Sequence, residues 1–180
     1  QNTGEEGNGI SRLLKRLSNF TYSTDMMSEF VRKAVSPNDI LQAKKENRHA
    51  LYFTGNGVPL PQDWISVEDE LRYISVFFNL GIRMMHLTYN RRNVIGDGCA
   101  ETANGGLSDF GRHVVKEMNR VGVIVDIAHS GWQTSLEAAQ TSEKPMVASH
   151  TTVASINKHI RSKPDPVIRA IADTGGYIGI

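Results

Sequence analysis

Apolar positions along the chain follow two spacings that alternate from about residue 49 onward. Short, nearly continuous apolar runs are separated by longer segments in which apolar residues recur every three or four positions. Continuous runs are typical of strands buried on both faces, and the wider spacing is typical of amphipathic helices. The pattern therefore predicts strands at residues 49–54, 82–89, 123–129, 145–150 and 177–180.

The segments between these strands carry the signals that begin and end helices. Ser66 and Ser108 stand at N-cap positions, and Pro166 lies in a first turn, where its missing N–H costs little. Gly81 and Gly175 follow the last apolar positions of their segments, as C-cap glycines do. These signals predict helices at residues 66–81, 108–122, 130–142 and 165–176.

An α/β fold follows from this regular alternation, because parallel strands need helical crossovers between them. We predict part of a (β/α)₈ TIM-type barrel. The competing doubly wound sheet usually places a glycine-rich phosphate turn and a helix directly after its first strand. The segment "TGNGVPLP" (54–61) contains two prolines, which prevent a helix there.

The chain is predicted to be a single domain over residues 1–180, the central portion of a larger barrel. Residues 1–46 form a helical lead-in, and residues 47–180 carry the alternating strands and helices. Residues 10–20 predict a helix with one apolar and one basic face. We interpret this helix as a cover for the barrel, with attachment to a membrane surface as the alternative.

Composition narrows the classes of partner. The 180 residues can bury one sizeable core, and the formal net charge is +1 with 22% charged residues. This balance gives no indication of a nucleic-acid partner. No apolar run reaches the 18 residues that a membrane span requires. The single cysteine, Cys99, excludes an internal disulfide.

Two predicted strands each end on a histidine, His129 and His150. The carboxyl ends of parallel strands meet at one rim of a barrel, where active sites are found. Neighbouring strands lie about 4.8 Å apart, so two imidazoles there can share one metal ion. A hydrogen bond from each ring to a loop carbonyl is the alternative.

Other polar residues near these strands are given structural roles. His86 is interpreted as a structural residue in mid-strand. Asp126 is interpreted as a buried hydrogen-bond acceptor that faces away from His129, with a supporting role behind a metal ligand as the alternative. The long loop from Asn90 to Gly106 is expected to shape a substrate pocket, because long loops at this rim often do.

Four segments together resemble the membrane (renal) dipeptidase family of zinc peptidases. They are "GIRMMHLTYN" (81–90), "GLSDFGRHVVKEMNRVGVIVDIAHSG" (106–131), "KPMVASHTT" (144–152) and "AIADTGGYIGI" (170–180), in the family's order. The resemblance covers roughly residues 38 to 180. It implies a barrel of the metallo-dependent hydrolase type that hydrolyses dipeptides with one or two zinc ions, and an association as homodimers.

The resemblance also implies roles for individual residues. His129 and His150 correspond to two ligands of one zinc ion. Arg161 corresponds to an arginine that binds the terminal carboxylate of the substrate, for which a planar guanidinium is well suited. Tyr89 stands where the family has an active-site histidine, and its hydroxyl can assist catalysis as a hydrogen-bond donor.

The sequence departs from the family at the metal site. Gln62 falls at the position counted for a metal-bridging glutamate, and we retain it as a candidate metal ligand. A neutral amide cannot offset the repulsion between two cations as a carboxylate does. No His-x-Asp pair precedes residue 49, although the family uses one as ligands. These departures leave a second interpretation open, an inactive or repurposed relative that binds a peptide-like ligand.

Overall fold

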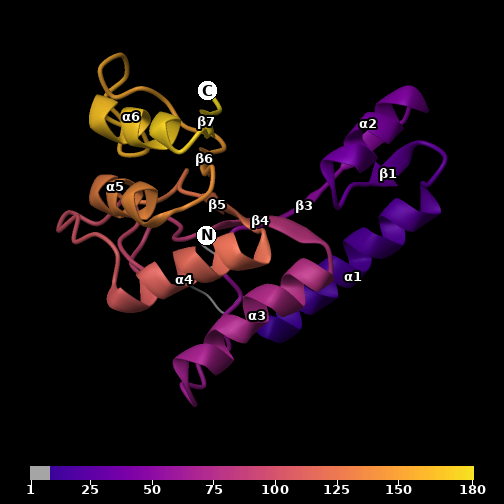
Figure 1. Ribbon diagram of the computed structural model, residues 1–180, viewed down its shortest axis with the longest axis horizontal. Coiled ribbons are helices and arrows are strands. Elements are labelled where there is room, and N and C mark those ends of the chain that lie inside the picture. Colours follow the sequence, from indigo (N-terminus) through magenta and orange to yellow (C-terminus); the bar gives the residue numbers. More distant parts are fainter. Residues whose placement is uncertain (1–8) are drawn as a thin grey trace.

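Five parallel strands form the main sheet of the computed structural model, which describes residues 9–180. Their order across the sheet is their order along the chain, as successive right-handed crossovers produce. This arrangement confirms the predicted α/β fold with a parallel sheet (Figure 1). The strands are β3 (Phe53–Gly55), β4 (Ile82–His86), β5 (Ile124–Asp126), β6 (Val147–Ala148) and β7 (Tyr177–Ile178).

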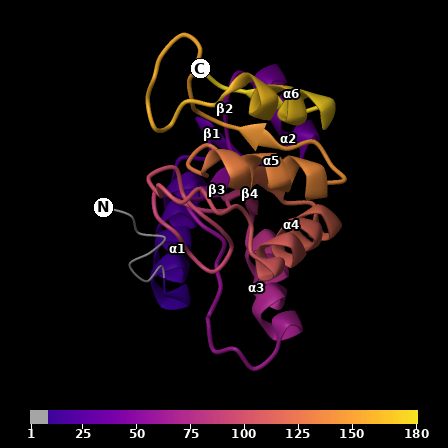
Figure 2. The same ribbon diagram turned by 90° about the vertical axis from the view of Figure 1, so that its left-hand side faces the viewer.

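One helix follows each of the first four strands of this sheet, as predicted. The Ser66 and Ser108 side chains cap the first two helices by accepting hydrogen bonds from the N–H groups of Asp69 and Gly111. Neighbouring helices are in contact, and Figures 1 and 2 show them stacked in sequence along one side of the sheet. They are α3 (Val67–Asn79), α4 (Asp109–Val121), α5 (Trp132–Thr141) and α6 (Asp165–Asp173).

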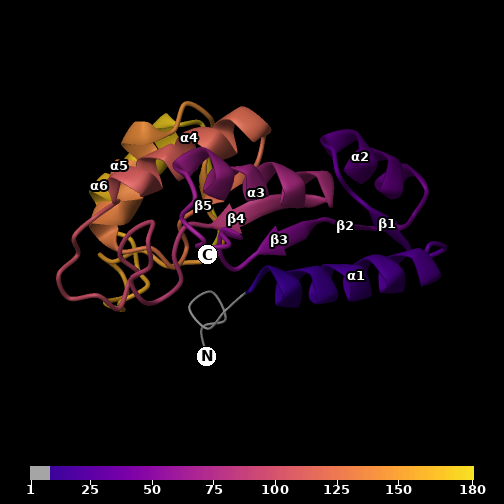
Figure 3. The same cartoon turned by 90° about the horizontal axis from the view of Figure 1, so that it is seen from below.

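The N-terminal part differs from the predicted helical lead-in because it contains a strand. Between α1 (Ile10–Met26) and α2 (Pro37–Lys45) lies β1 (Val31–Lys33), which pairs with β2 (His49–Leu51). The strand predicted at residues 49–54 is therefore two strands, with Tyr52 between them. Figure 3 shows α1 on one side of these strands and α2 and α3 on the other. Residues 1–8 of the predicted lead-in lie outside the described residues.

The hydrophobic core lies between the sheet and its helices. Ile74 and Phe77 of α3, Val114 and Met118 of α4, and Met85 of β4 have no exposed surface. Burial of these side chains fixes the strands against the helices and thereby sets where each strand ends. Among residues 9–180, no helix is long and apolar enough to cross a membrane.

Candidate metal centre

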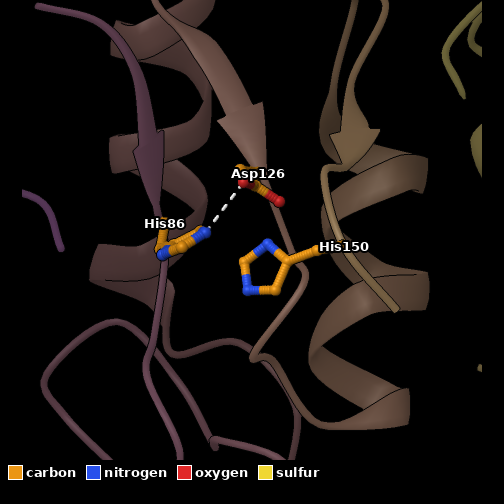
Figure 4. Close-up of side chains that lie close together, drawn as sticks. All are labelled: His86, Asp126 and His150. Atoms are coloured by element: carbon orange, nitrogen blue, oxygen red, sulfur yellow. Dashed lines mark ion pairs between the residues drawn. The ribbon is translucent and has the colours of Figure 1, made fainter. Parts of the chain in front are cut away.

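Three histidines converge at the carboxyl ends of three neighbouring strands. His86 is the last residue of β4, His129 follows β5, and His150 follows β6. Their ring centroids are 5.1 Å apart for His129 and His150, 5.2 Å for His86 and His129, and 5.6 Å for His86 and His150. Figure 4 shows His86 and His150 on either side of the same space, with Asp126 beside them. The sheet thus brings His129 and His150 together as the sequence predicted.

The closest approach within this group is between two ring nitrogens. The Nε2 atoms of His129 and His150 lie 3.1 Å apart. Zinc–nitrogen bonds of about 2.0–2.1 Å at tetrahedral angles place two ligand nitrogens about 3.4 Å apart. The observed separation is therefore near that expected for two imidazoles on one ion.

The other nitrogen of each ring is already engaged. Nδ1 of His129 lies 2.8 Å from Oδ1 of Asn90, and Nδ1 of His150 lies 2.8 Å from Oγ of Ser149. The Asn90 oxygen also accepts from Cys99 Sγ, so it is an acceptor for His129. Ser149 Oγ donates to the Asp126 carboxylate, so its lone pair accepts from His150. Each imidazole therefore carries its proton on Nδ1.

This assignment leaves both Nε2 atoms as bare lone pairs that face each other. Two lone pairs at this distance repel unless a proton or a cation lies between them. Burial, followed by the nearby Arg161 guanidinium, lowers the pKa of His129 to about 3. The same causes lower the pKa of His150. A shared proton is disfavoured near neutral pH, and the donor set fits a metal ion.

Asp126 is the anchor of the group and has no exposed surface. Oδ1 accepts hydrogen bonds from the N–H groups of Ala128 and Ser149, and Oδ2 accepts from Ser149 Oγ and from His86 Nε2, the latter at 2.8 Å. Burial alone raises the pKa of this carboxyl, but these hydrogen bonds hold it below its usual value. Asp126 is therefore an anion that orients two of the three histidines.

Asp126 is the buried hydrogen-bond acceptor that the sequence predicted, and it ties β5 to His86 of β4 and to Ser149 after β6. His86 belongs to the same group of side chains. One ligand atom of His86, one of Asp126 and one of His150 lie within 4.8 Å of one another. His86 was expected in mid-strand, but β4 ends at this residue. Asp126 was expected to face away from His129; β5 ends at Asp126, and the chain turns between these two residues. The only feature of the sequence that indicated a role for Asp126 was its position three residues before His129.

Gln62 is not brought into this group. It lies seven residues beyond Gly55, the end of β3, in an exposed loop with a left-handed φ of 60°. Its N–H donates to the buried Glu70 carboxylate at 2.9 Å, which shapes the loop before α3. Counting back from β4 without a gap placed the candidate ligand in this loop rather than at the strand end. β3 ends on a glycine, so it offers no carboxylate at the rim either.

Tyr89 and Arg161 lie against the histidines. The Tyr89 ring stacks on the His129 ring, with centroids 3.8 Å apart and planes 18° apart. Arg161 donates from Nε to the carbonyl oxygen of Ala128 at 3.3 Å and from Nη2 to that of His150 at 3.1 Å. Because a guanidinium has five N–H donors, these two bonds fix its position and leave donors for a further acceptor.

Lys163 is a buried cation that the sequence did not single out. It has no exposed surface, and Nζ donates to the Ser130 carbonyl oxygen at 2.5 Å and to Ser135 Oγ at 3.2 Å. Burial lowers the pKa of Lys163 to about 7. The lysine thereby supports the turn that directly follows His129.

Within the loop between β4 and α4, the backbone at Gly98 packs tightly against the backbone of Tyr89 and Asn90. A Cβ atom on Gly98 would lie 2.3 Å from the carbonyl carbon of Asn90 and 2.3 Å from the carbonyl oxygen of Tyr89. Cys99 and Thr102 of the loop, together with Trp132 of α5, line a cavity of about 360 Å³. The loop that was expected to shape a pocket therefore both borders a cavity and holds the partner of His129.

The whole chain, residues 1–180, matches the family described as membrane dipeptidase (Peptidase family M19). The chain belongs to this family. The resemblance found in its motifs is thereby confirmed.

Individual relatives agree with this membership. Dipeptidase verJ of Clonostachys rogersoniana is 36% identical over 105 residues, which are 57% of this chain and 27% of that protein. The crystal structure of an amidohydrolase from Pseudomonas aeruginosa is 33% identical with a TM-score of 0.82, over 94% of this chain and 50% of that one. The chain thus spans half or less of the length of these relatives.

A third relative supports the fold. A metallo peptidase from Rhodobacter sphaeroides, liganded with a phosphinate mimic of the dipeptide L-Ala-D-Ala, is 18% identical with a TM-score of 0.77. The match covers 90% of this chain and 46% of that one. The family's α/β barrel architecture is thus shared at low sequence identity.

Proposed function

We propose that the full-length protein hydrolyses dipeptides with the help of a divalent metal ion, expected to be zinc, held by His129 and His150. The observation that carries this proposal is the pair of facing Nε2 atoms 3.1 Å apart, each on a ring whose Nδ1 is already engaged. Family membership supports the reaction class, and the imidazole donors favour zinc among common divalent ions.

The residues around the metal ligands have separate tasks in this proposal. Asn90 and Ser149 hold the two imidazoles in the tautomer that presents Nε2. Arg161 binds the carboxylate at the end of the substrate with the donors that Ala128 and His150 leave free. A bound divalent ion supplies Lewis acidity toward the peptide carbonyl and toward water.

Tyr89 is proposed to donate its phenolic O–H to the carbonyl oxygen as negative charge develops on it. The stack on His129 fixes the ring beside the metal ligands, so the hydroxyl does not have to be ordered during the reaction.

Removal and restoration of the metal tests the proposal. Full-length protein treated with a chelator should lose cleavage of a broad dipeptide panel and regain it with added zinc. His129→Gln should lower kcat/KM by at least about 10³-fold, because a direct ligand is lost. His113→Gln, at an exposed site on α4, is the matched control. Zinc-loaded protein that cleaves no dipeptide would refute the proposal.

The second candidate function is a relative without peptidase activity that binds a peptide-like ligand through Arg161. The absence of a carboxylate at the end of β3 favours it, because Gly55 stands there. Elemental analysis separates the two candidates: bound zinc supports the peptidase, and full-length protein without metal supports the binder.

The resemblance also supports a homodimer, which light scattering on the full-length protein would detect.

A further inference from the structure

Two basic side chains from one short segment reach the turn that carries His129. Arg161 donates from Nε to the carbonyl oxygen of Ala128 at 3.3 Å. Two residues further on, Lys163 donates from Nζ to the carbonyl oxygen of Ser130 at 2.5 Å. These two carbonyl groups belong to the residues immediately before and after His129. The segment that precedes α6 therefore holds the backbone on both sides of this proposed metal ligand.

The backbone of Lys163 is fixed within the loop that follows His150. Its N–H donates to the carbonyl oxygen of Thr152 at 2.8 Å, and its own carbonyl oxygen accepts from the N–H of Ala154 at 2.9 Å. Its side chain lies instead against the turn after β5 and the start of α5, where Nζ also donates to Ser135 Oγ at 3.2 Å. Lys163 thus links the loop after β6 to the turn after β5 through protein groups alone.

Stability alone does not favour a lysine at this position. Lys163 has no exposed surface, and its two acceptors, the Ser130 carbonyl and the Ser135 hydroxyl, are neutral. Transfer of an amine from water to such a site costs free energy that hydrogen bonds to neutral groups offset only in part. A methionine is nearly as long, lacks the polar end and would fill the same space without that cost. The lysine is therefore explained by what its hydrogen bonds hold in place.

An independent contact ties the same segment to α5. Trp132, the first residue of α5, donates from Nε1 to the carbonyl oxygen of Ser162 at 2.7 Å. Loss of the Lys163 amine should therefore leave the loop attached to this helix. What is lost is the contact to the turn beside His129, so the effect should fall on the geometry of the site rather than on the fold.

We propose that Lys163 is a positioning residue for His129 and Arg161. Through Ser130, it keeps the turn after β5 at a fixed distance from the segment that carries Arg161. The inference rests on the proposed function, in which His129 binds the metal ion and Arg161 binds the terminal carboxylate of the dipeptide. Both anchors must be in place at once, because a misplacement of about 1 Å can lower a rate by about 10²-fold.

Lys163→Met in the full-length protein tests the proposal. At saturating zinc, KM for dipeptides with a free terminal carboxylate should rise about 10-fold, and KM for the corresponding amides should rise far less. The affinity for zinc, measured by competition with a chromophoric chelator, should fall about 10-fold. Lys158→Met, the same substitution at an exposed position of the same loop, should change neither quantity.

Two further variants separate positioning from a general loss of structure. Lys163→Arg keeps N–H donors that can reach the carbonyl oxygen of Ser130, and it should restore most of the KM effect and of the zinc affinity. Lys163→Gln has a shorter side chain that falls short of this oxygen, so it should repeat the losses of Lys163→Met. It also takes the place of that variant if Lys163→Met does not fold. Circular dichroism and thermal unfolding establish which variants are folded.

A folded Lys163→Met or Lys163→Gln variant with wild-type KM and zinc affinity would overturn the proposal. A folded Lys163→Arg variant with the same losses as Lys163→Met would overturn it too, because the hydrogen-bond donor would then not be what matters. In either case, wild-type protein that cleaves dipeptides with zinc leaves the proposed function standing. If zinc-loaded wild type cleaves no dipeptide, the proposed function fails, and the zinc affinities of the variants still decide whether Lys163 positions His129.

Discussion

Ser149 Oγ donates a hydrogen bond to Asp126 Oδ2, and the same oxygen lies 2.8 Å from Nδ1 of His150. The buried carboxylate thus determines, through one hydroxyl, which nitrogen of His150 carries the proton. Asn90 does the same for His129 from the loop on the other side. The two proposed metal ligands are thus positioned by neighbours that would not themselves need to touch the ion.

Replacing Ser149 by alanine should therefore weaken metal binding without removing a ligand. We expect the affinity for zinc to fall about 10- to 100-fold, because His150 loses the acceptor that fixes its tautomer. Competition with a chromophoric chelator measures this loss. Ser155→Ala, at an exposed position in the following loop, should leave the affinity unchanged. Equal affinities in the two variants would contradict the orienting role of Ser149.

Two substitutions at Tyr89 separate its hydroxyl from its ring. Tyr89→Phe keeps the stack on His129 and should lower kcat about 10²-fold with little change in zinc affinity. Tyr89→Leu also removes the stack and should lower the zinc affinity as well. Steady-state kinetics with zinc titrations distinguish the two effects. A Tyr89→Phe variant with wild-type kcat would show that the hydroxyl takes no part.

Arg161→Lys should raise KM for dipeptides that have a free terminal carboxylate. A lysine cannot make the paired hydrogen bonds of a guanidinium, so we expect kcat/KM to fall about 10- to 100-fold. Dipeptide amides, which lack the carboxylate, should be affected far less. The measurement is the ratio of kcat/KM for acid and amide substrates, with metal content checked by elemental analysis. An unchanged ratio would remove Arg161 from the substrate site.

Lys163 should make the stability depend on pH in the alkaline range. Because burial lowers its pKa from 10.5 to about 7, the unfolded chain holds a proton between these pH values that the folded chain has released. The free energy of unfolding should therefore rise with pH across this window, by an amount on the order of a few kcal/mol.

Lys163→Met removes this titration. The free energy of unfolding of the variant minus that of the wild type should be more positive at pH 7 than at pH 10. Urea unfolding of both proteins at several pH values measures it, and other titrating groups cancel in the difference. Parallel curves across the whole range would show that Lys163 is not neutral in the folded protein.

The order of strands and helices could be predicted because burial imposes a characteristic spacing of apolar residues on each strand and each helix. Ser66, Ser108 and the glycines marked helix ends for the same local reason. Strand ends were not predictable, since the apolar pattern continues past β4 through the buried residues Leu87 and Thr88. His86 was therefore assigned to mid-strand, although the strand ends there.

The contacts of Asp126 could be predicted only in part, for a related reason. Alternation of faces holds only while the chain stays extended, and the N–H of Ser130 bonds to the carbonyl oxygen of Ile127 in a turn. Strand alternation therefore does not relate the direction of His129 to that of Asp126. The long-range partners of these residues, Ser149 and Asn90, lie 23 and 39 residues away and leave no local pattern.

The close approach of Gly98 to Asn90 limits how the specificity of this protein can be redesigned. Libraries that vary the loop after β4 to admit new substrates would include position 98, where any side chain collides with backbone. Relief of that collision would displace Asn90 and release His129 from its hydrogen bond. Randomisation should therefore spare Gly98, or selections for altered specificity will mostly recover proteins in which the proposed metal site is disrupted.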